Sequence, residues 1–152
     1  MSDRALQHVK LFADGADLEG ILALYADPAI RGFTTNPTLM RQAGIDDYES
    51  FARELLDAVP DRPISLEVFA DDPADMERQA VKITSWGEHV YVKIPVTNTE
   101  GEFMGPLLRR LVADGVKVNV TALMTVAQVE EVAECLADGP PACVSVLSLI
   151  HI

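Results

Sequence analysis

The stretch Val90-Tyr-Val-Lys-Ile-Pro-Val96 combines a face of aliphatic side chains with a face that carries a tyrosine and a lysine. Alternate residues of a β-strand point to the same side, so the stretch predicts a strand with one apolar and one polar face. Residues 64–69 and 116–122 repeat this pattern. A central strand of an open doubly wound sheet is apolar on both faces, whereas a barrel of parallel strands collects polar strand-end residues at one mouth. The pattern therefore favours the barrel.

Apolar stretches of strand length alternate along the chain with segments of helical period, which predicts parallel strands joined by helices. The expected strands span residues 9–13, 32–35, 64–69, 90–95, 116–122 and 143–149, and the expected helices span 18–26, 47–58, 73–85, 102–113 and 126–137. Two helix starts are marked as well. Asp46 followed by Glu49 resembles a capping box, and Asp72 before Pro73 is typical of an N-cap.

The spacing of the polar residues near the strand ends counts the strand–helix units. These residues are Asp14, Asn36, Glu67, Lys93, Thr121 and Ser145, and they follow one another at an average of about 26 residues. A closed barrel needs eight units, which at this spacing would take roughly 200 residues. We therefore expect an α/β chain that forms a single partial (β/α)8 TIM-barrel domain over residues 1–152, with about six of the eight units and a truncated or misjoined reading frame.

The composition excludes several classes of protein. The 152 residues include 12 Lys+Arg and 24 Asp+Glu, a formal net charge of −12, with no basic cluster to bind nucleic acid or an anionic membrane. No uncharged stretch is long enough to cross a bilayer, and the N-terminus lacks the apolar core of a signal peptide. Cys135 and Cys143 suit a reducing cytoplasm, and His8, His89 and His151 are too scattered to form a metal site. We expect a cytoplasmic protein without metal, nucleic-acid or membrane partners.

Lys93 is the residue best suited to covalent chemistry. It interrupts an apolar strand, where an ammonium group would be poorly solvated. Desolvation favours the neutral amine, which is a nucleophile toward a ketone. The structural alternative is an edge-strand lysine whose amine extends to water.

Asp14 and Glu67 are candidates for proton transfer. Asp14 ends the first expected strand before a glycine, so it could also serve only as a turn residue. Glu67 lies inside a strand, where an unpaired carboxylate is costly. It could form a structural pair with Lys93 or Lys117, or it could transfer protons.

The amide and hydroxyl residues at the strand ends also have structural explanations. Asn36 precedes a proline and could belong to a turn. Asn119 and Thr121 could be interior polar groups with satisfied hydrogen bonds. Their shared location at strand ends is what indicates one functional site.

Five motifs in order along the chain carry a resemblance to a known family. They cover about residues 9 to 146 and comprise Leu11-Phe-Ala-Asp14, Gly32-Phe-Thr-Thr-Asn-Pro-Thr-Leu39, Ser65-Leu-Glu-Val68, Val92-Lys-Ile-Pro95 and Val118-Asn-Val-Thr121. Together they resemble the transaldolase and fructose-6-phosphate aldolase family, whose members are class I aldolases on a barrel. The second and fourth motifs are a specific signature when they occur in one chain.

The resemblance implies a role for each candidate residue. Lys93 would be the Schiff-base lysine and Asp14 the acid/base residue, while Glu67 and Thr121 would hold a catalytic water. Asn36, Asn119 and Ser145 would contact substrate hydroxyls. A glutamate at position 67 resembles transaldolase, because the fructose-6-phosphate aldolase branch tends to have glutamine there.

The implied activity is the transfer of a dihydroxyacetone unit between sugar phosphates, as in the pentose phosphate pathway. The protonated imine would serve as the electron sink, so no metal or organic cofactor is expected. One alternative is a lyase of the fructose-6-phosphate aldolase type. An alternative of another class is an inactive fragment or a non-catalytic α/β binding module.

The sequence departs from the family pattern after Val146. Leu147 stands where the family has an aromatic residue, and Ile150 stands where it has a phosphate-binding arginine. We therefore expect residues 147–152 not to be family sequence and phosphate recognition to be weakened.

Unpaired strand edges favour association. The isolated chain should therefore be poorly soluble or oligomeric, and the full-length form is expected to be a homo-oligomer.

Overall fold

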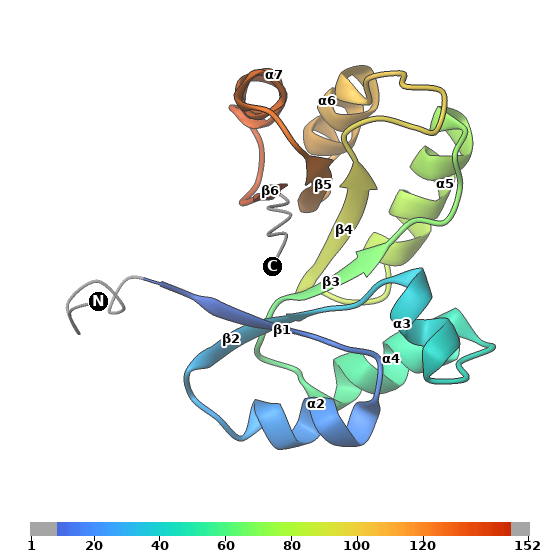
Figure 1. Cartoon of the computed structure of the whole chain (residues 1–152), viewed down its shortest axis with the longest axis vertical. Coiled ribbons are helices and arrows are strands. Elements are labelled where there is room, and N and C mark those ends of the chain that lie inside the picture. Colours follow the sequence, from blue (N-terminus) through green and yellow to red (C-terminus); the bar gives the residue numbers. More distant parts are fainter. Residues whose placement is uncertain (1–8, 147–152) are drawn as a thin grey trace, which may run out of the picture. The chain divides into compact units, whose positions relative to one another are not determined.

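The computed structural model describes residues 9–146, in which strands and helices alternate within two compact units (Figure 1). Unit 1 runs to Ile64. It contains β1 (Leu11–Asp14), α2 (Leu18–Tyr25), β2 (Ile30–Thr34), α3 (Pro37–Gln42) and α4 (Tyr48–Ala58). Unit 2 begins at Ser65 and contains β3 (Ile64–Glu67) apart from its first residue, α5 (Pro73–Thr84), β4 (Val90–Pro95), α6 (Gly105–Ala113), β5 (Val118–Leu123), α7 (Val126–Leu136) and β6 (Cys143–Val146).

All six expected strands are present, with their ends shifted by a few residues. Residues 147–149 of the sixth expected strand lie outside the described part of the chain. The helix α3 is an addition to the expected elements, because Asn36-Pro37 indicated a turn at the sequence level. Asn36 is in fact the N-cap and Pro37 the first helical residue, a position where proline needs no backbone N–H partner.

In unit 1, β1 and β2 pair in parallel, with Asp14 opposite Thr34. Gly32 lies opposite Phe12 in this pair, and a Cβ atom there would collide with the phenylalanine ring. The backbone N–H of Phe33 donates to the carbonyl of Pro63 at 2.9 Å. This bond places the chain that leads into β3 beside β2, so the strands of unit 1 follow one another in chain order.

In unit 2, the strands are also hydrogen-bonded in chain order. The N–H of Val68 donates to the carbonyl of Lys93 at 3.2 Å, and β4–β5 and β5–β6 are parallel pairs. This order is that of a TIM barrel, whereas a doubly wound sheet reverses its order at a switch point. The α/β class and the barrel-type strand order expected from the sequence are confirmed for the strands described.

The register of β5 against β6 contains one extra residue. Val120 is opposite Val144 and Leu123 is opposite Val146, so β5 advances three residues while β6 advances two. Ala122, inside this bulge, has a φ of 62°. A bulge of one residue reverses the alternation of faces, and Leu123 accordingly is fully buried with the aliphatic residues of the strand.

The core of unit 2 lies between the aliphatic strand faces and the helices. In β4 the residues alternate between buried and half-buried, with Val90, Val92 and Ile94 on the buried side. The helices α5 and α7 contact β4 and β5, respectively, and α6 packs against both helices and against β5. Each buried aliphatic side chain stabilises the fold by roughly 1.5–3 kcal/mol. The strand face opposite the helices is therefore the one left for polar side chains.

Polar N-caps begin most of the helices. Asp72 accepts hydrogen bonds from the N–H groups of Ala74 and Asp75 at the start of α5, as expected. At α4 the expectation of an Asp46 capping box is wrong, because Asp47 is the N-cap and accepts from the N–H of Ser50 at 3.0 Å. Within residues 9–146 there is no helix whose length and apolar character would let it cross a membrane.

Candidate active site

Lys93 lies in the middle of β4, on the strand face that carries polar residues. On one side its carbonyl accepts the N–H of Val68, and on the other it is in register with Asn119 of β5. The alternative of an edge-strand lysine that extends to water is therefore wrong. The side chain is 13% exposed. Burial also raises the pKa of Tyr91, two residues earlier on this face, with a smaller contribution from Cys143, so its phenol stays neutral.

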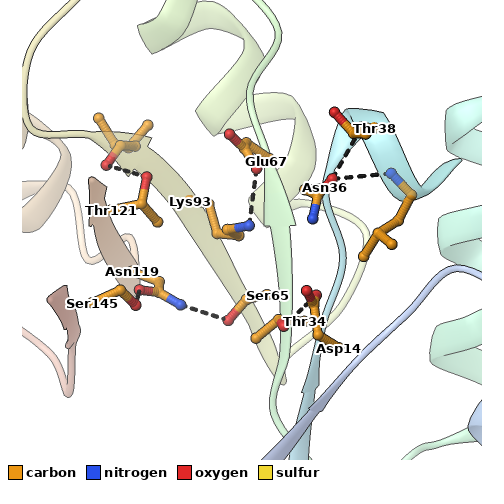
Figure 2. Close-up of polar contacts among 12 residues, drawn as sticks. Asp14, Thr34, Asn36, Thr38, Ser65, Glu67, Lys93, Asn119, Thr121 and Ser145 are labelled. Carbon is orange, nitrogen blue, oxygen red and sulfur yellow. Dashed lines mark hydrogen bonds and ion pairs between the residues drawn. The ribbon is translucent and has the colours of Figure 1, made fainter. Parts of the chain in front are cut away.

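The amine of Lys93 forms an ion pair with Glu67, at 2.9 Å from Nζ to Oε2 (Figure 2). The Glu67 side chain is 25% exposed. At the sequence level the partner of Glu67 was open between Lys93 and Lys117. The amine of Lys117 donates instead to the carbonyl of Glu88 at 2.8 Å. An amine and a carboxylate at hydrogen-bonding distance, both shielded from bulk water, can exchange a proton with each other or with a bound reactant.

A chain of hydrogen bonds crosses the same face from β6 to β3. The Ser145 hydroxyl donates to Oδ1 of Asn119 at 2.7 Å, and Nδ2 of Asn119 donates to the Ser65 hydroxyl at 3.1 Å (Figure 2). Ser65 and Asn119 belong to β3 and β5, with β4 between them. Their side chains therefore converge over β4, as they do on the inner face of a curved sheet. Asn119 and Ser145, expected to belong to one site, lie together.

Thr121 follows Asn119 by two residues and so lies on the same face of β5. Its hydroxyl is half-buried, and its contact with the carbonyl of Ile94 is long, at 3.5 Å. Strong hydroxyl bonds are closer to 2.7–2.8 Å. The Thr121 hydroxyl can therefore exchange this contact for a water or a ligand.

The two candidate residues of unit 1 hold local hydrogen bonds. Asp14 accepts from the hydroxyl of Thr34, its neighbour in β2, at 2.7 Å. Asn36 caps α3, where its Oδ1 accepts from the N–H groups of Thr38 and Leu39, both at 3.0 Å. The side-chain oxygen of Asn36 is thus used structurally, and its Nδ2 is the group that can donate to a ligand. A predominantly apolar cavity of about 390 Å³ lies beside Asp14, bounded by α2 and α3.

Two hydroxyl residues of these clusters were not assigned from the sequence, namely Ser65 and Thr34. Ser65 precedes Glu67 by two residues and therefore shares its strand face, a signal that was present in the alternation. Thr34 could be found only from the β1–β2 register.

Leu147 and Ile150, where the sequence departs from the resemblance, lie outside the described residues. Among residues 9–146, no three His, Cys, Asp or Glu side chains are grouped so that they could hold a metal ion.

Comparisons with known proteins agree with the motifs. The family model described as transaldolase/fructose-6-phosphate aldolase matches residues 11–149. A probable transaldolase from Dehalococcoides mccartyi is 36% identical over 120 residues, which are 79% of this chain and 54% of that protein. A probable transaldolase from Streptococcus pyogenes serotype M5 is 38% identical over 120 residues, covering 79% and 53%. The chain therefore spans about half the length of the curated relatives it matches.

A solved structure supports the fold at low sequence identity. Dihydrodipicolinate synthase from Rhodopseudomonas palustris superimposes with a TM-score of 0.58 and 18% identity. The match covers 83% of this chain and 52% of that one. At this identity the similarity concerns the arrangement of strands and helices alone.

Proposed function

Because the chain belongs to the transaldolase/fructose-6-phosphate aldolase family, we propose that it carries the Schiff-base chemistry of a transaldolase. In this proposal Lys93 attacks the ketone of a ketose phosphate, and a dihydroxyacetone unit then passes to an acceptor sugar phosphate. The observation that supports the proposal most is the Lys93–Glu67 pair, an amine 2.9 Å from a carboxylate on a shielded strand face.

The first stage forms a carbon–nitrogen bond between Lys93 and the ketone carbon. The amine attacks without its extra proton, which the Glu67 carboxylate can accept at this distance. The ketone oxygen becomes the hydroxyl of a carbinolamine. When Glu67 returns the proton, that hydroxyl leaves as water and an iminium remains. Thr121, whose present hydrogen bond is long, would hold together with Glu67 the water that relays these protons.

The second stage breaks a carbon–carbon bond. Asp14 would take the proton from the hydroxyl beside that bond, and an aldehyde then leaves. The bonding electrons move into the iminium, which becomes an enamine. The enamine attacks the acceptor aldehyde, Asp14 returns the proton, and water releases the product from Lys93. The bond from the Thr34 hydroxyl holds the Asp14 carboxyl group in one orientation, which supports this assignment.

The remaining polar residues would recognise the substrate. Asn119 and Ser145 share a hydrogen bond on the Lys93 face, and Asn36 keeps its Nδ2 as a donor. These groups suit sugar hydroxyls, which both donate and accept. Glu67 favours a transaldolase over a lyase, because the resemblance associates glutamine with the lyase branch.

The experiment is to trap the imine. The chain is incubated with fructose 6-phosphate and reduced with borohydride, and the modified residue is mapped by mass spectrometry. We expect an adduct on Lys93. Lys93→Ala and Lys93→Arg should both abolish it, because guanidinium cannot act as the amine nucleophile. Lys117→Arg is the matched control, because Lys117 lies directly before β5 and its amine already binds a backbone carbonyl; it should leave the adduct intact.

The possible results separate the alternatives. An adduct on Lys10, Lys82 or Lys117 with Lys93 unmodified would refute the assignment. Release of dihydroxyacetone without an acceptor aldehyde would identify the lyase alternative. If no ketose labels the folded chain, the alternative of an inactive fragment or a binding module holds.

A further inference from the structure

We propose that Ser65 is a positioning residue, which holds the Asn119 side chain in the orientation that a ligand on the Lys93 face requires. The inference rests on the proposed function, in which Asn119 contacts a hydroxyl of the bound ketose. Ser65 itself would not touch the ligand and would act only through Asn119.

Burial makes the Ser65–Asn119 bond important. The exposed fractions of Ser65 and Asn119 are 1% and 4%. A buried polar group without a hydrogen-bond partner is costly, so each needs the other or a substitute. The bond joins residues 54 positions apart in the sequence and crosses β4, the strand of Lys93. It is therefore a tertiary contact of the polar face and not part of a turn or a cap.

The Asn119 amide is held at both ends. Oδ1 accepts from Ser145 and Nδ2 donates to Ser65, which uses one acceptor and one donor of the group. A terminal amide torsion is broad and roughly two-fold when nothing restrains it. The two hydroxyls come from strands on either side of β5, so together they fix the plane of the amide. The second N–H and the second lone pair of the amide therefore point in set directions. With Ser145 alone, the amide can swing about that single contact.

Ser65 also differs from Glu67, the other polar residue of its strand, in what it offers a ligand. Glu67, two residues later, is 25% exposed in its side chain, whereas the Ser65 residue is almost fully covered. The Ser65 hydroxyl already accepts the Nδ2–H of Asn119 at 3.1 Å, and in this proposal it has no contact of its own with the ligand. Its effect on binding must therefore pass through the amide to which it is bonded.

The first test reads the Asn119 amide directly and does not depend on activity. In the full chain labelled with ¹⁵N, the two side-chain N–H signals of Asn119 are followed by NMR. We expect Ser65→Ala to shift the N–H that faces position 65 and to speed its exchange with solvent at least fivefold. Ser65→Thr, which keeps the hydroxyl, should restore the protection. Ser85→Ala removes a hydroxyl that only caps the end of α5 and should change nothing. Unchanged Asn119 signals in Ser65→Ala would overturn the proposal.

The second test uses borohydride trapping at Lys93 with two ketones. Dihydroxyacetone has hydroxyls for Asn119 to bind, and acetone has none. We expect Ser65→Ala to raise the dihydroxyacetone concentration for half-maximal labelling about five- to tenfold, while labelling by acetone stays unchanged. In an Asn119→Ala background, Ser65→Ala should add no further loss, since it acts through the missing amide. Equal losses with both ketones, or additive losses in the double variant, would mean that Ser65 is merely structural.

The two tests separate this proposal from the proposed function. If wild-type chain gives no Lys93 adduct with either ketone, the Schiff-base proposal fails for this chain, and the NMR result still decides whether Ser65 positions Asn119. If the adduct forms and the NMR signals do not respond, only the Ser65 proposal fails.

Discussion

Replacing Glu67 with glutamine should destabilise unit 2, because it removes the negative charge that pairs with the Lys93 ammonium group. The substitution keeps the size and shape of the side chain. Removing one partner of a fully buried ion pair costs about 3–5 kcal/mol, whereas an exposed pair contributes about 0–1 kcal/mol. With side chains 13% and 25% exposed, the Lys93–Glu67 pair lies between these limits and nearer the buried one. We expect a loss of about 2 kcal/mol, or roughly 30-fold in the folding equilibrium.

The measurement is urea unfolding followed by circular dichroism. The free energy of unfolding changes by roughly 1–3 kcal/mol per molar urea for small proteins, so the midpoint should fall by about 1 M. Glu49→Gln is the matched control. Glu49 pairs with Arg53 one helical turn away, with side chains 35% and 52% exposed. Such a helical pair is worth only about 0.3–0.5 kcal/mol, so its midpoint should hardly move.

A double substitution identifies the origin of the loss. If the cost comes from a shielded ammonium group that has lost this carboxylate, then adding Lys93→Met to Glu67→Gln should recover part of the stability, because it removes that ammonium group. The reasoning is refuted if Glu67→Gln costs no more than Glu49→Gln. It is also refuted if Lys93→Met lowers the free energy of unfolding as much in the Glu67→Gln background as it does in the wild-type chain, because the two substitutions would then be independent.

Three further outcomes follow from the described contacts. Gly32→Ala should lower the melting temperature by several degrees, a loss of roughly 1–3 kcal/mol, because the added Cβ meets an aromatic ring and lies 2.8 Å from the Pro63 carbonyl; an unchanged melting temperature would contradict the close packing. Asn36→Ala should cost about 1 kcal/mol through the lost cap of α3, measured by urea unfolding against Asn36→Asp, which keeps a capping oxygen. The hydroxyl and N–H of Thr99 lower the pKa of Asp71, so this contact stabilises the fold above the ordinary carboxyl pKa of 3.8 and is lost as the pH falls through the lower folded-state value. When the free energy of unfolding is measured as a function of pH, it should therefore fall less steeply below pH 3.8 in Asp71→Asn than in wild type. Parallel curves for the two proteins would count against the contact.

The strands and their faces could be predicted because one physical rule controls them. A strand packed under helices on one side must alternate, and the sequence of β4 shows this alternation without interruption. The added residue in β5 could not be predicted in the same way, because a bulge depends on the partner strand. The prediction of the α4 N-cap was wrong for a similar reason. Asp46 and Asp47 are chemically equal, and only the backbone direction selects Asp47.

For the candidate site, the sequence predicted which residues share a face but not which partners they choose. Lys93 and Glu67 stand on the polar faces of neighbouring strands, yet Lys117 was an equally good partner by charge. Its amine is held by the backbone carbonyl of Glu88, which lies before β4, and no sequence pattern reports this contact. Ser65 could have been found by extending the alternation of β3 by one step.

The bulge in β5 also limits the ways in which this sheet can misfold. A strand that slips by one residue exchanges its two faces, which in β5 would turn Asn119 toward the helices. The bulge fits only one alignment, because three steps of β5 must match two of β6 around Ala122, whose backbone occupies the left-handed region. A slipped pairing would lose the hydrogen bonds that hold Ala122 in this conformation, which costs on the order of 1–3 kcal/mol and persists only where the surrounding structure imposes it. The bulge at Ala122 thus sets the alignment of β5 with β6 and, with it, the side of the sheet on which Leu123 is buried.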